Sequence, residues 1–414
     1  MSAASIRNLM QERWTGLDPG EFRLLLDEVF GGPGQYDGIN KKCLHIPLGG
    51  GDARVALQFK GSRIVRITPG PSFDANQWVS FTDEVQTGLI DGPQKIAREL
   101  SFAGQPVQGS WRGELSGVQI LPPPRSAPLP PQMLAEHPFI LEFPLRQCSR
   151  WPITNHRRLR LHERLSNLLN VLVTQRITTA PRRHEQLWAI VRAGKTMRTR
   201  WAQRSYFAKI GPIVRNTHAS SAKTSIGLVE PSTYYGTLGN DGQGLRLPAD
   251  LDVQIFRYLS MSPAQQERFD RAAYWMSMAS RQWEVSMSLS FTALVSAVEA
   301  LTDRGVQHKI HCPDCDKTVS HESPGATERF RAFLAHYAEG TLDKGRQSEI
   351  YALRSGILHG SSLITLDFDL AHGWDPPWWN ERQLHSDLWR VTSAALRNWL
   401  RNLDSPVSAA QNAA

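Results

Sequence analysis

The chain has 414 residues, of which 41% are hydrophobic, with 13 tryptophans and a net charge of +8, which is enough apolar material for two or three domains. It contains no run of about 18 apolar residues, so no membrane-spanning helix is predicted, and its first residues lack the apolar stretch of a secretory signal. Four cysteines in this length argue against a disulfide scaffold and for a reducing compartment, so we predict a cytoplasmic protein.

The N-terminal part predicts a mixed α/β region. Residues 44–48, 54–59 and 63–68 have the composition of short strands, and residues 78–100 are expected to form a helix. Residues 121–131 contain six prolines, which indicates an extended linker or a domain boundary.

The next part of the chain predicts fewer elements. Residues 139–143 are expected to form a strand, and residues 156–174 an amphipathic helix, because leucines recur there every three or four positions. Residues 176–258 alternate short elements with loops, and no topology is predicted for them.

Residues 146–215 hold most of the positive charge. They contain 16 Lys and Arg residues and two acidic residues, a net charge of +14, whereas the rest of the chain carries −6. Tryptophan, tyrosine and phenylalanine lie among these cations, and arginine forks with aromatic faces suit a phosphate backbone with unstacked bases. We therefore expect nucleic-acid binding; the alternative is a basic surface that balances the acidic remainder or packs on it. The arginines expected to bind are Arg157, Arg158, Arg160, Arg182, Arg183, Arg198, Arg200 and Arg204.

From Ser262 onward the sequence predicts helices. Ser262, with Pro263 at the first helical position and Gln265 two residues later, resembles a capping box and starts a helix that runs to about residue 285. Four further helices are expected, and the five together suit an up-and-down bundle. The four are residues 286–303, residues 327–339, a helix that Ser348 could cap and that stops at Gly360, and residues 383–403.

Two connections in this half are predicted as irregular. Residues 366–370 suggest a short extended piece in which Asp367 and Asp369 are solvated carboxylates without a role, and residues 375–379 suggest a loop. The fold class is therefore α+β, a mixed N-terminal region followed by an all-α bundle. The predicted division is a mixed region at 1–130, a basic segment at 131–258, a bundle at 262–404 with a Cys/His insert at 304–326, and a disordered tail at 405–414.

The fourth of these helices carries Arg354 and His359. Arginine is a permanent cation whose forked donors suit phosphate, and histidine can exchange a proton near neutral pH. Arg354 flanks an apolar stripe, where a charge needs a partner or an interface. A five-residue step turns about 140° around a helix, so the two side chains share one site only if the helix end unwinds or if two copies meet. The alternative is a chance pairing on one helix.

The insert carries a second cluster, made of two cysteines and three histidines. A Cys-x-x-Cys pair flanked by histidines predicts a structural zinc site with sulfur and nitrogen ligands, although a second Cys-x-x-Cys is missing, so histidines must complete it. The alternatives are a reduced thiol pair and a redox pair. The candidate ligands are His308, His311, Cys312, Cys315 and His321. No cofactor is expected for catalysis.

The order of these features resembles a known family. A late helix that reads Leu353-Arg-Ser-x-x-x-His359-Gly360, after an apolar helix at 291–301 and a Cys-containing insert, is similar to the HEPN superfamily, and within it to the Apea-like branch. The resemblance covers about residues 262–404 only. It implies a homodimer with the Arg/His pairs at the two-fold interface and, in catalytic members, a metal-independent RNA endonuclease.

The resemblance also implies roles for single residues. Arg354 would hold the phosphate and stabilise the charge of the transition state, His359 would act as general acid or base, and Glu299 would orient or neutralise Arg354. Active members often carry Asn, Asp or His directly after the arginine, where this chain has Ser355. The implied function is an RNA-directed effector, an endoribonuclease of a prokaryotic stress or phage-defence system with the N-terminal region as sensor. The alternative is a non-catalytic module that dimerises and binds nucleic acid or a partner.

Overall fold

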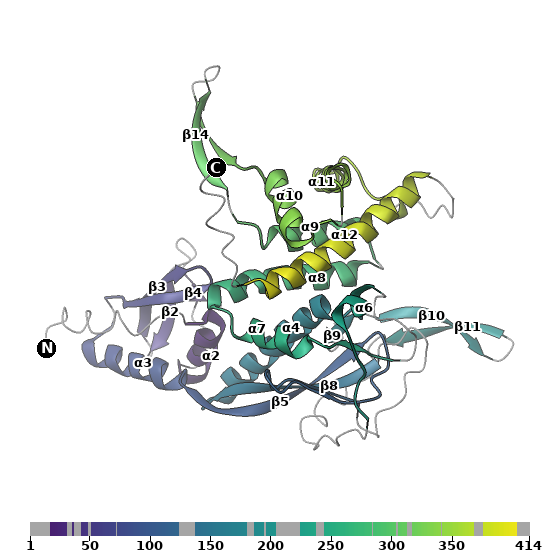
Figure 1. Ribbon diagram of the computed structural model, residues 1–414. Coiled ribbons are helices and arrows are strands. Elements are labelled where there is room, and N and C mark those ends of the chain that lie inside the picture. The colour runs from purple at the N-terminus through teal and green to yellow at the C-terminus, as the bar shows by residue number, and fades with distance from the viewer. Residues whose placement is uncertain are drawn as a thin grey trace. The chain divides into compact units, whose positions relative to one another are not determined.

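The computed structural model describes residues 17–30, 35–36, 43–48, 51–71, 73–123, 137–179, 186–193, 196–203, 224–236, 244–283, 285–303, 305–312, 317–340, 342–367 and 376–403 (Figure 1). Contacts divide the chain into two units, residues 1–97 with 143–161, and residues 98–142 with 162–414. The second unit thus contains residues 98–142 and 162–258 together with the helices after Ser262, and the division predicted from the sequence stays a prediction. Helices and strands both occur, which confirms the α+β class.

The first unit contains an antiparallel sheet with strand order β1-β2-β3-β4 and two helices, together with residues 89–97 and 143–161. The three strands predicted from the sequence are confirmed, and Gly61 adopts a left-handed φ of 59° in the turn between β3 and β4, a conformation that favours glycine. The elements are α2 (Pro19–Phe30), β1 (Gln35–Tyr36), β2 (Cys43–Leu48), β3 (Gly51–Lys60), β4 (Arg63–Pro69) and α3 (Ala75–Gly88).

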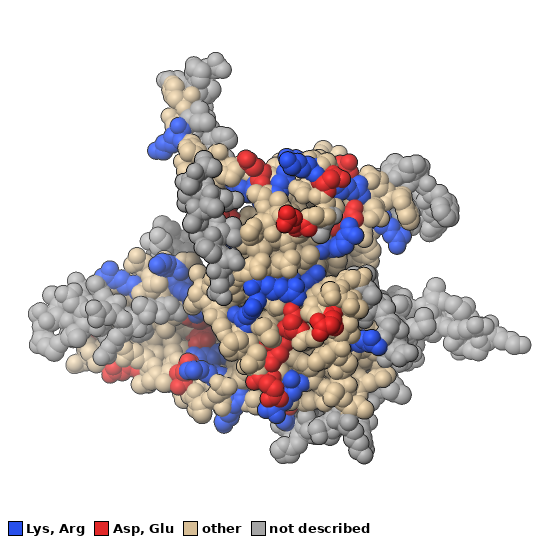
Figure 2. Space-filling model, viewed as in Figure 1, with Lys and Arg blue, Asp and Glu red and all other residues tan. Residues whose placement is uncertain are grey.

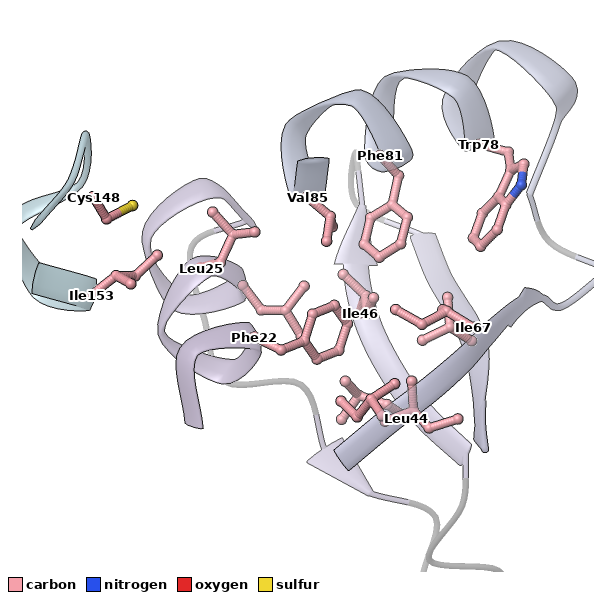
Figure 3. Close-up of a cluster of buried hydrophobic side chains, with 14 residues drawn as sticks. Phe22, Leu25, Leu44, Ile46, Ile67, Trp78, Phe81, Val85, Cys148 and Ile153 are labelled. Atoms are coloured by element: carbon pink, nitrogen blue, oxygen red, sulfur yellow. The ribbon is translucent and has the colours of Figure 1, made fainter. Parts of the chain in front are cut away.

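The core of this unit lies between the sheet and the two helices (Figure 3). Trp78, Phe81 and Val85 share one face of α3 because they are spaced by three and four residues, and all three are buried. The rings of Trp78 and Phe81 stack with centroids 5.4 Å apart. Phe22 from α2 completes the aromatic contact with Phe81 at 6.4 Å.

The helix predicted at residues 78–100 is wrong in its second half. Helix α3 ends at Gly88, and residues Asp91–Ala103 form strand β5. Gly92 and Pro93 explain the difference, because glycine is a poor helix former and proline removes a backbone donor. From Ala97 onward nearly every residue of the strand is buried, so both of its faces are covered. Such a run of buried residues cannot be distinguished from a buried helix by periodicity alone.

A five-stranded sheet with the order β6-β7-β8-β5-β9 belongs mainly to the second unit. The predicted strand at 139–143 lies within β8 and the predicted helix at 156–174 overlaps α4, where leucines at 165, 168 and 172 are buried. His162 of α4 and Ser101 of β5 are joined by a buried 2.7 Å hydrogen bond. The elements are β6 (Trp111–Arg112), β7 (Gln119–Leu121), β8 (His137–Cys148), α4 (Trp151–Leu172) and β9 (Ile177–Thr179).

Short elements connect this sheet to the helices that follow. Strands β10 and β11 pair as an antiparallel hairpin, and β12 and β13 pair in parallel. Their bounds are β10 (Gln186–Ala193), β11 (Thr196–Gln203), β12 (Leu228–Val229), α6 (Pro231–Gly236), β13 (Leu247–Pro248) and α7 (Leu251–Leu259).

Five helices after Ser262 are found close to their predicted positions among the described residues. The capping box of Ser262 and Gln265 is present, with Pro263 in the first turn. The apolar helix α9 packs against α8, α10, α11 and α12 and is therefore central. The bounds are α8 (Pro263–Gln282), α9 (Met287–Glu299), α10 (Ala326–Tyr337), α11 (Lys344–Leu358) and α12 (Pro376–Arg401), and the hairpin β14 (Val306–Cys312) and β15 (Lys317–Ser323) is inserted between α9 and α10.

The starts of two helices differ from the prediction. Helix α11 begins before Ser348, because the carboxylate of Asp343 accepts a 2.7 Å hydrogen bond from the backbone nitrogen of Arg346 and so caps the first turn. Ser348 instead donates to the carbonyl of Lys344 inside the helix. Helix α12 begins at Pro376, within the predicted loop, since proline is tolerated in a first turn.

Asp367 has a role that the sequence did not predict. Its carboxylate accepts hydrogen bonds from the hydroxyl of Ser286 at 2.8 Å and from the backbone nitrogens of Met287 and Ser288 at 2.7 and 2.9 Å. Burial opposes the charge, but these hydrogen bonds outweigh it and lower the pKa of Asp367. Asp367 therefore caps α9 from a short 3₁₀ turn at Thr365–Asp367, while residues 368–370 of the predicted extended piece, Asp369 among them, lie outside the described residues.

In the described residues, no helix is both long enough and apolar enough to cross a membrane.

Candidate functional site

Helices α9 and α11 bring Arg354 and Glu299 together. The Nη2 of Arg354 donates to Oε2 of Glu299 at 2.9 Å, and the hydroxyl of Tyr351 donates to Oε1 of the same carboxylate at 3.1 Å. Tyr351 and Arg354 are three residues apart on α11 and so share a face, with the guanidinium carbon 5.4 Å from the centre of the Tyr351 ring. The contact between Arg354 and Glu299 that the resemblance implied is thus formed.

Electrostatics favour this arrangement. Burial and the neighbouring carboxylate of Glu299 raise the pKa of Tyr351, so its hydroxyl stays protonated at neutral pH and remains a donor. The Arg354 and Glu299 side chains are 21% and 26% exposed, so their ion pair is largely shielded from solvent. The Nε of Arg354 is buried and has no hydrogen-bond partner among the described residues.

Arg354 lines a pocket with three other arginines. The pocket has a volume of about 570 Å³, and its walls come from α8, from the end of α9 and the residues after it, from α10 and from α11. We call it the arginine pocket. Four arginines and two acidic residues give its lining a net charge of +2. The lining residues are Arg268, Arg271, Glu299, Ala300, Thr302, Asp303, Ala326, Arg329, Tyr351 and Arg354.

Contacts within the protein hold the other arginines in place. Arg268 donates to the carbonyl of Leu301 and lies 3.0 Å from the carboxylate of Asp303. Arg329 donates to the carbonyl of Pro324 at 2.7 Å. Arg271 meets Glu267 at 3.2 Å, in a pair whose members are both about half exposed. A guanidinium has five N–H donors in a rigid fork, so fixed arginines around one hollow suit the binding of an oxyanion.

His359 lies outside this pocket. It is the C-terminal cap of α11, its side chain is exposed, and its backbone nitrogen donates to the carbonyl of Ser355 at 3.0 Å. Gly360 follows with φ of 71° and ends the helix as predicted. Ser355 is half-buried and does not line the pocket. Within one copy the structure therefore joins Arg354 to Glu299 and leaves His359 on the surface.

The candidate zinc ligands fall at different points of the hairpin formed by β14 and β15. His308 and His321 are Cα partners across the two strands, whereas Cys312 lies four residues further along β14. At ~3.4 Å per strand residue that separation is ~14 Å, too far for one ion whose bonds are about 2.0–2.3 Å long.

The described residues do not test the predicted zinc site further. His311 is exposed beside Cys312, and Cys315 lies outside the described residues. No group of three metal-ligating side chains occurs among the residues that are described.

Three of the predicted nucleic-acid-binding arginines contact the protein itself. Arg157 donates to both oxygens of Glu21 at 2.9 and 2.8 Å and to Asp91 at 2.7 Å, and its side chain is only 15% exposed. Its hydrogen bonds to Glu21 raise the pKa of the guanidinium. Arg160 pairs with Asp18, and Arg158 binds Asn155. These contacts fit the alternative in which basic side chains pack on acidic ones.

The other five arginines of that prediction are not described at side-chain level. Arg198 and Arg200 lie on β11, opposite Val191 and Ala189, while Arg182, Arg183 and Arg204 lie outside the described residues. On the face shown in Figure 2, Lys and Arg side chains of the described residues lie among Asp and Glu side chains instead of forming one unbroken basic surface.

Sequence reasoning did not single out Arg268, Arg271 or Arg329. Arg268 and Arg271 are three residues apart and share a face of α8, which was the one local signal available. That spacing also fits an ordinary solvated face, and only the packing of α8, α10 and α11 brings the three to Arg354.

Comparison of the chain with models of known protein families, with curated proteins and with solved structures found no match. The resemblance to the HEPN superfamily therefore stays a prediction from the motif, and the function has to be inferred from the geometry of the arginine pocket.

Proposed function

We propose that the chain is an RNA-directed effector that holds an RNA phosphate in the arginine pocket and cleaves RNA as a metal-independent endoribonuclease. The observation that carries this proposal is the convergence of Arg268, Arg271, Arg329 and Arg354 on one hollow. Fixed arginine forks are the side chains best suited to phosphate oxygens.

Arg354 is the central residue of the proposal. Glu299 and Tyr351 hold its guanidinium in place, so little side-chain entropy is lost when a phosphate binds. Donors fixed in advance also stabilise the extra negative charge that develops on a phosphorus centre under attack. Arg354 would therefore bind the phosphate and stabilise the transition state.

His359 would act as general base towards the ribose 2′-hydroxyl or as general acid towards the leaving 5′-oxygen. In the proposed reaction the ribose 2′-hydroxyl loses its proton to a base and attacks the adjacent phosphorus, while the bond to the 5′-oxygen breaks and that oxygen takes up a proton. The products are a 2′,3′-cyclic phosphate and a 5′-hydroxyl. Because His359 is exposed and outside the pocket of its own copy, the proposal includes a homodimer in which His359 of a second copy serves the pocket.

Cleavage in the presence of a chelator tests the proposal. Labelled single-stranded RNA is incubated in EDTA with the wild type, Arg354→Ala, His359→Ala and the control Arg390→Ala. The control removes a cation from α12 that is 64% exposed and outside the pocket. We expect cleavage by the wild type and the control, and none by the other two variants. Equal cleavage by all four proteins would overturn the proposed roles.

The position of His359 favours a second candidate, a non-catalytic module that dimerises and binds RNA. In that case the wild type binds the labelled RNA without cutting it, Arg354→Ala weakens binding, and His359→Ala leaves binding unchanged.

A further inference from the structure

The lining of the arginine pocket offers no aromatic face to a base. Among its described residues Tyr351 alone is aromatic, and it is buried with its hydroxyl donating to Glu299. The Tyr351 ring also lies 5.4 Å from the Arg354 guanidinium and 5.4 Å from the Phe330 ring. An RNA phosphate in the pocket brings the bases of its strand with it, so a contact with a base has to come from the rim.

Trp275 lies at this rim, in the same row of α8 as two of the pocket arginines. Successive residues of a helix are about 100° apart, so Arg268 and Arg271 point about 60° apart, and Trp275 points between them, within about 40° of each. Trp275 follows Arg271 by four residues, a rise of about 6 Å, and the two are neighbours on the helix surface. The row therefore leads from two arginines of the pocket lining to an indole beside it.

Helix α9 runs antiparallel to α8 along this row. The hydroxyl of Ser290 donates to the carbonyl of Ala279 at 2.8 Å, and nearer the other end of α8 Arg268 donates to the carbonyl of Leu301. Because Arg268, Trp275 and Ala279 are spaced by seven and four residues, they share one side of α8. Trp275 thus lies beside the middle of α9, whose C-terminal end forms part of the pocket wall.

The side chain of Trp275 is accessible to solvent. The residue is 40% exposed, as is the neighbouring Tyr274, and the two rings meet edge to face with their centroids 5.7 Å apart. The contact restricts the indole before any ligand arrives, which reduces the entropy lost on binding. Exposed aromatic rings beside cationic side chains are the groups on which unpaired bases stack, whatever the identity of the base.

We infer that Trp275 stacks on a base adjoining the phosphate that the arginine pocket holds. The inference rests on the proposed function in that RNA is the ligand of the pocket, and it goes further by naming the residue that contacts a base. A base inside a duplex is stacked on both of its faces, whereas an unpaired base has a face to offer. The site therefore takes single-stranded RNA with little preference among the bases.

Two oligonucleotides with the same number of phosphates test this inference. One is a fluorescent single-stranded 2′-O-methyl RNA, which lacks the attacking hydroxyl, and the other is an abasic strand of the same length and label. Their dissociation constants are measured by anisotropy in EDTA for the wild type, Trp275→Ala, Trp275→Phe and Arg354→Ala. The control is Trp379→Ala, which removes a tryptophan of α12 that is 60% exposed and outside the pocket.

We expect Trp275→Ala to bind the strand with bases about tenfold more weakly than the wild type, equivalent to about 1.4 kcal/mol and within the range for one stacked base. Its affinity for the abasic strand is unchanged, which also shows that the variant is folded. Trp275→Phe keeps most of the affinity because it retains an aromatic face, and Trp379→Ala binds like the wild type. Arg354→Ala weakens both strands, because it removes a contact with phosphate.

Three results overturn the inference. They are an unchanged affinity of Trp275→Ala for the strand with bases, an equal loss for both strands, and an unchanged affinity of Arg354→Ala for both. An equal loss that accompanies the conversion of a dimer to a monomer in light scattering assigns the indole to a contact between two copies instead.

Cleavage in EDTA without a base-specific loss in Trp275→Ala leaves the proposed function standing and removes the inference. A base-specific loss without cleavage leaves the stacking site standing and removes the endoribonuclease.

Discussion

Replacing Glu299 with glutamine isolates the charge that holds Arg354. The glutamine side chain has the same shape and keeps an acceptor for the Tyr351 hydroxyl, so the main loss is the ionic contact between Arg354 and Glu299 at 2.9 Å. Hydrogen bonds to charged groups contribute about 1.5–3 kcal/mol, and exposed ion pairs about 0–1 kcal/mol. With the two side chains 21% and 26% exposed, we expect a contribution between these limits, about 1–2 kcal/mol.

A double-mutant cycle measures this contribution directly. Glu299→Gln, Arg354→Gln and the double variant are compared by hydrogen exchange of the α9 and α11 amides, because local opening energies do not require a chain of two units to unfold in one step. We expect a coupling energy of about 1–2 kcal/mol. The control cycle uses Glu267 and Arg271, an i,i+4 pair on α8 whose side chains are 47% and 52% exposed, is followed through the α8 amides, and should give about 0.3–0.5 kcal/mol. A coupling below about 0.3 kcal/mol for the first pair would refute the reasoning.

Three further predictions concern stability and metal. Asp367→Asn keeps a carbonyl acceptor for α9 but removes the negative charge at the N-terminus of this helix, which contributes about 0.3–1 kcal/mol. Because the folded pKa of Asp367 lies below the ordinary 3.8, this charge stabilises the fold above about pH 4, and its contribution is lost as the pH falls through the folded pKa. The melting temperatures of wild type and variant should therefore converge in acid, and a constant difference contradicts this. Burial lowers the pKa of His385 from 6.5 to about 4, so unfolding takes up a proton between these pH values, and the free energy of unfolding decreases as the pH falls from 6.5 to 4. His385→Gln, which keeps a neutral partner for Ser290, should reduce this decrease. Parallel plots of melting temperature against pH for the two proteins would speak against it. Metal analysis of the purified protein should show that Cys312→Ser loses the predicted zinc whereas His308→Ala keeps it. The two positions are four residues apart on β14, too far to bind the same ion. Loss of zinc in His308→Ala would contradict this separation.

Local patterns were sufficient to predict most of the helices of the described residues but only four of the strands, β2, β3, β4 and β8. The capping box at Ser262 depends on residues three positions apart, and it forms as expected. The leucine period of α4 and the strand composition of β2 to β4 are also local signals. The helix predicted at 78–100 was wrong in its second half because β5 shows no alternation: its first residues are mostly exposed, and residues 99–103 are all buried, polar Glu99 and Ser101 included.

Long-range contacts explain what could not be predicted. Asp367 looked solvated because its partners, Ser286 to Ser288, are about 80 residues earlier in the chain. The arginine pocket depends in the same way on α8, α10 and α11, which only tertiary packing brings together. The contact between Glu299 and Arg354 is the one long-range contact that was expected, because the resemblance to the HEPN superfamily suggested it and the spacing of the residues did not.

The hairpin of β14 and β15 begins and ends at the arginine pocket. Asp303 precedes it and Ala326 follows it, both line the pocket, and its first cross-strand pair joins Val306 to Ser323. Equal lengths added to both strands or removed from them would leave that first pair, and hence the pocket wall, where it is. Lys309, an exposed residue of β14, is therefore a suitable point at which to attach a fluorescent label, since the hairpin links it covalently to both rims of the pocket and it is not one of the lining residues.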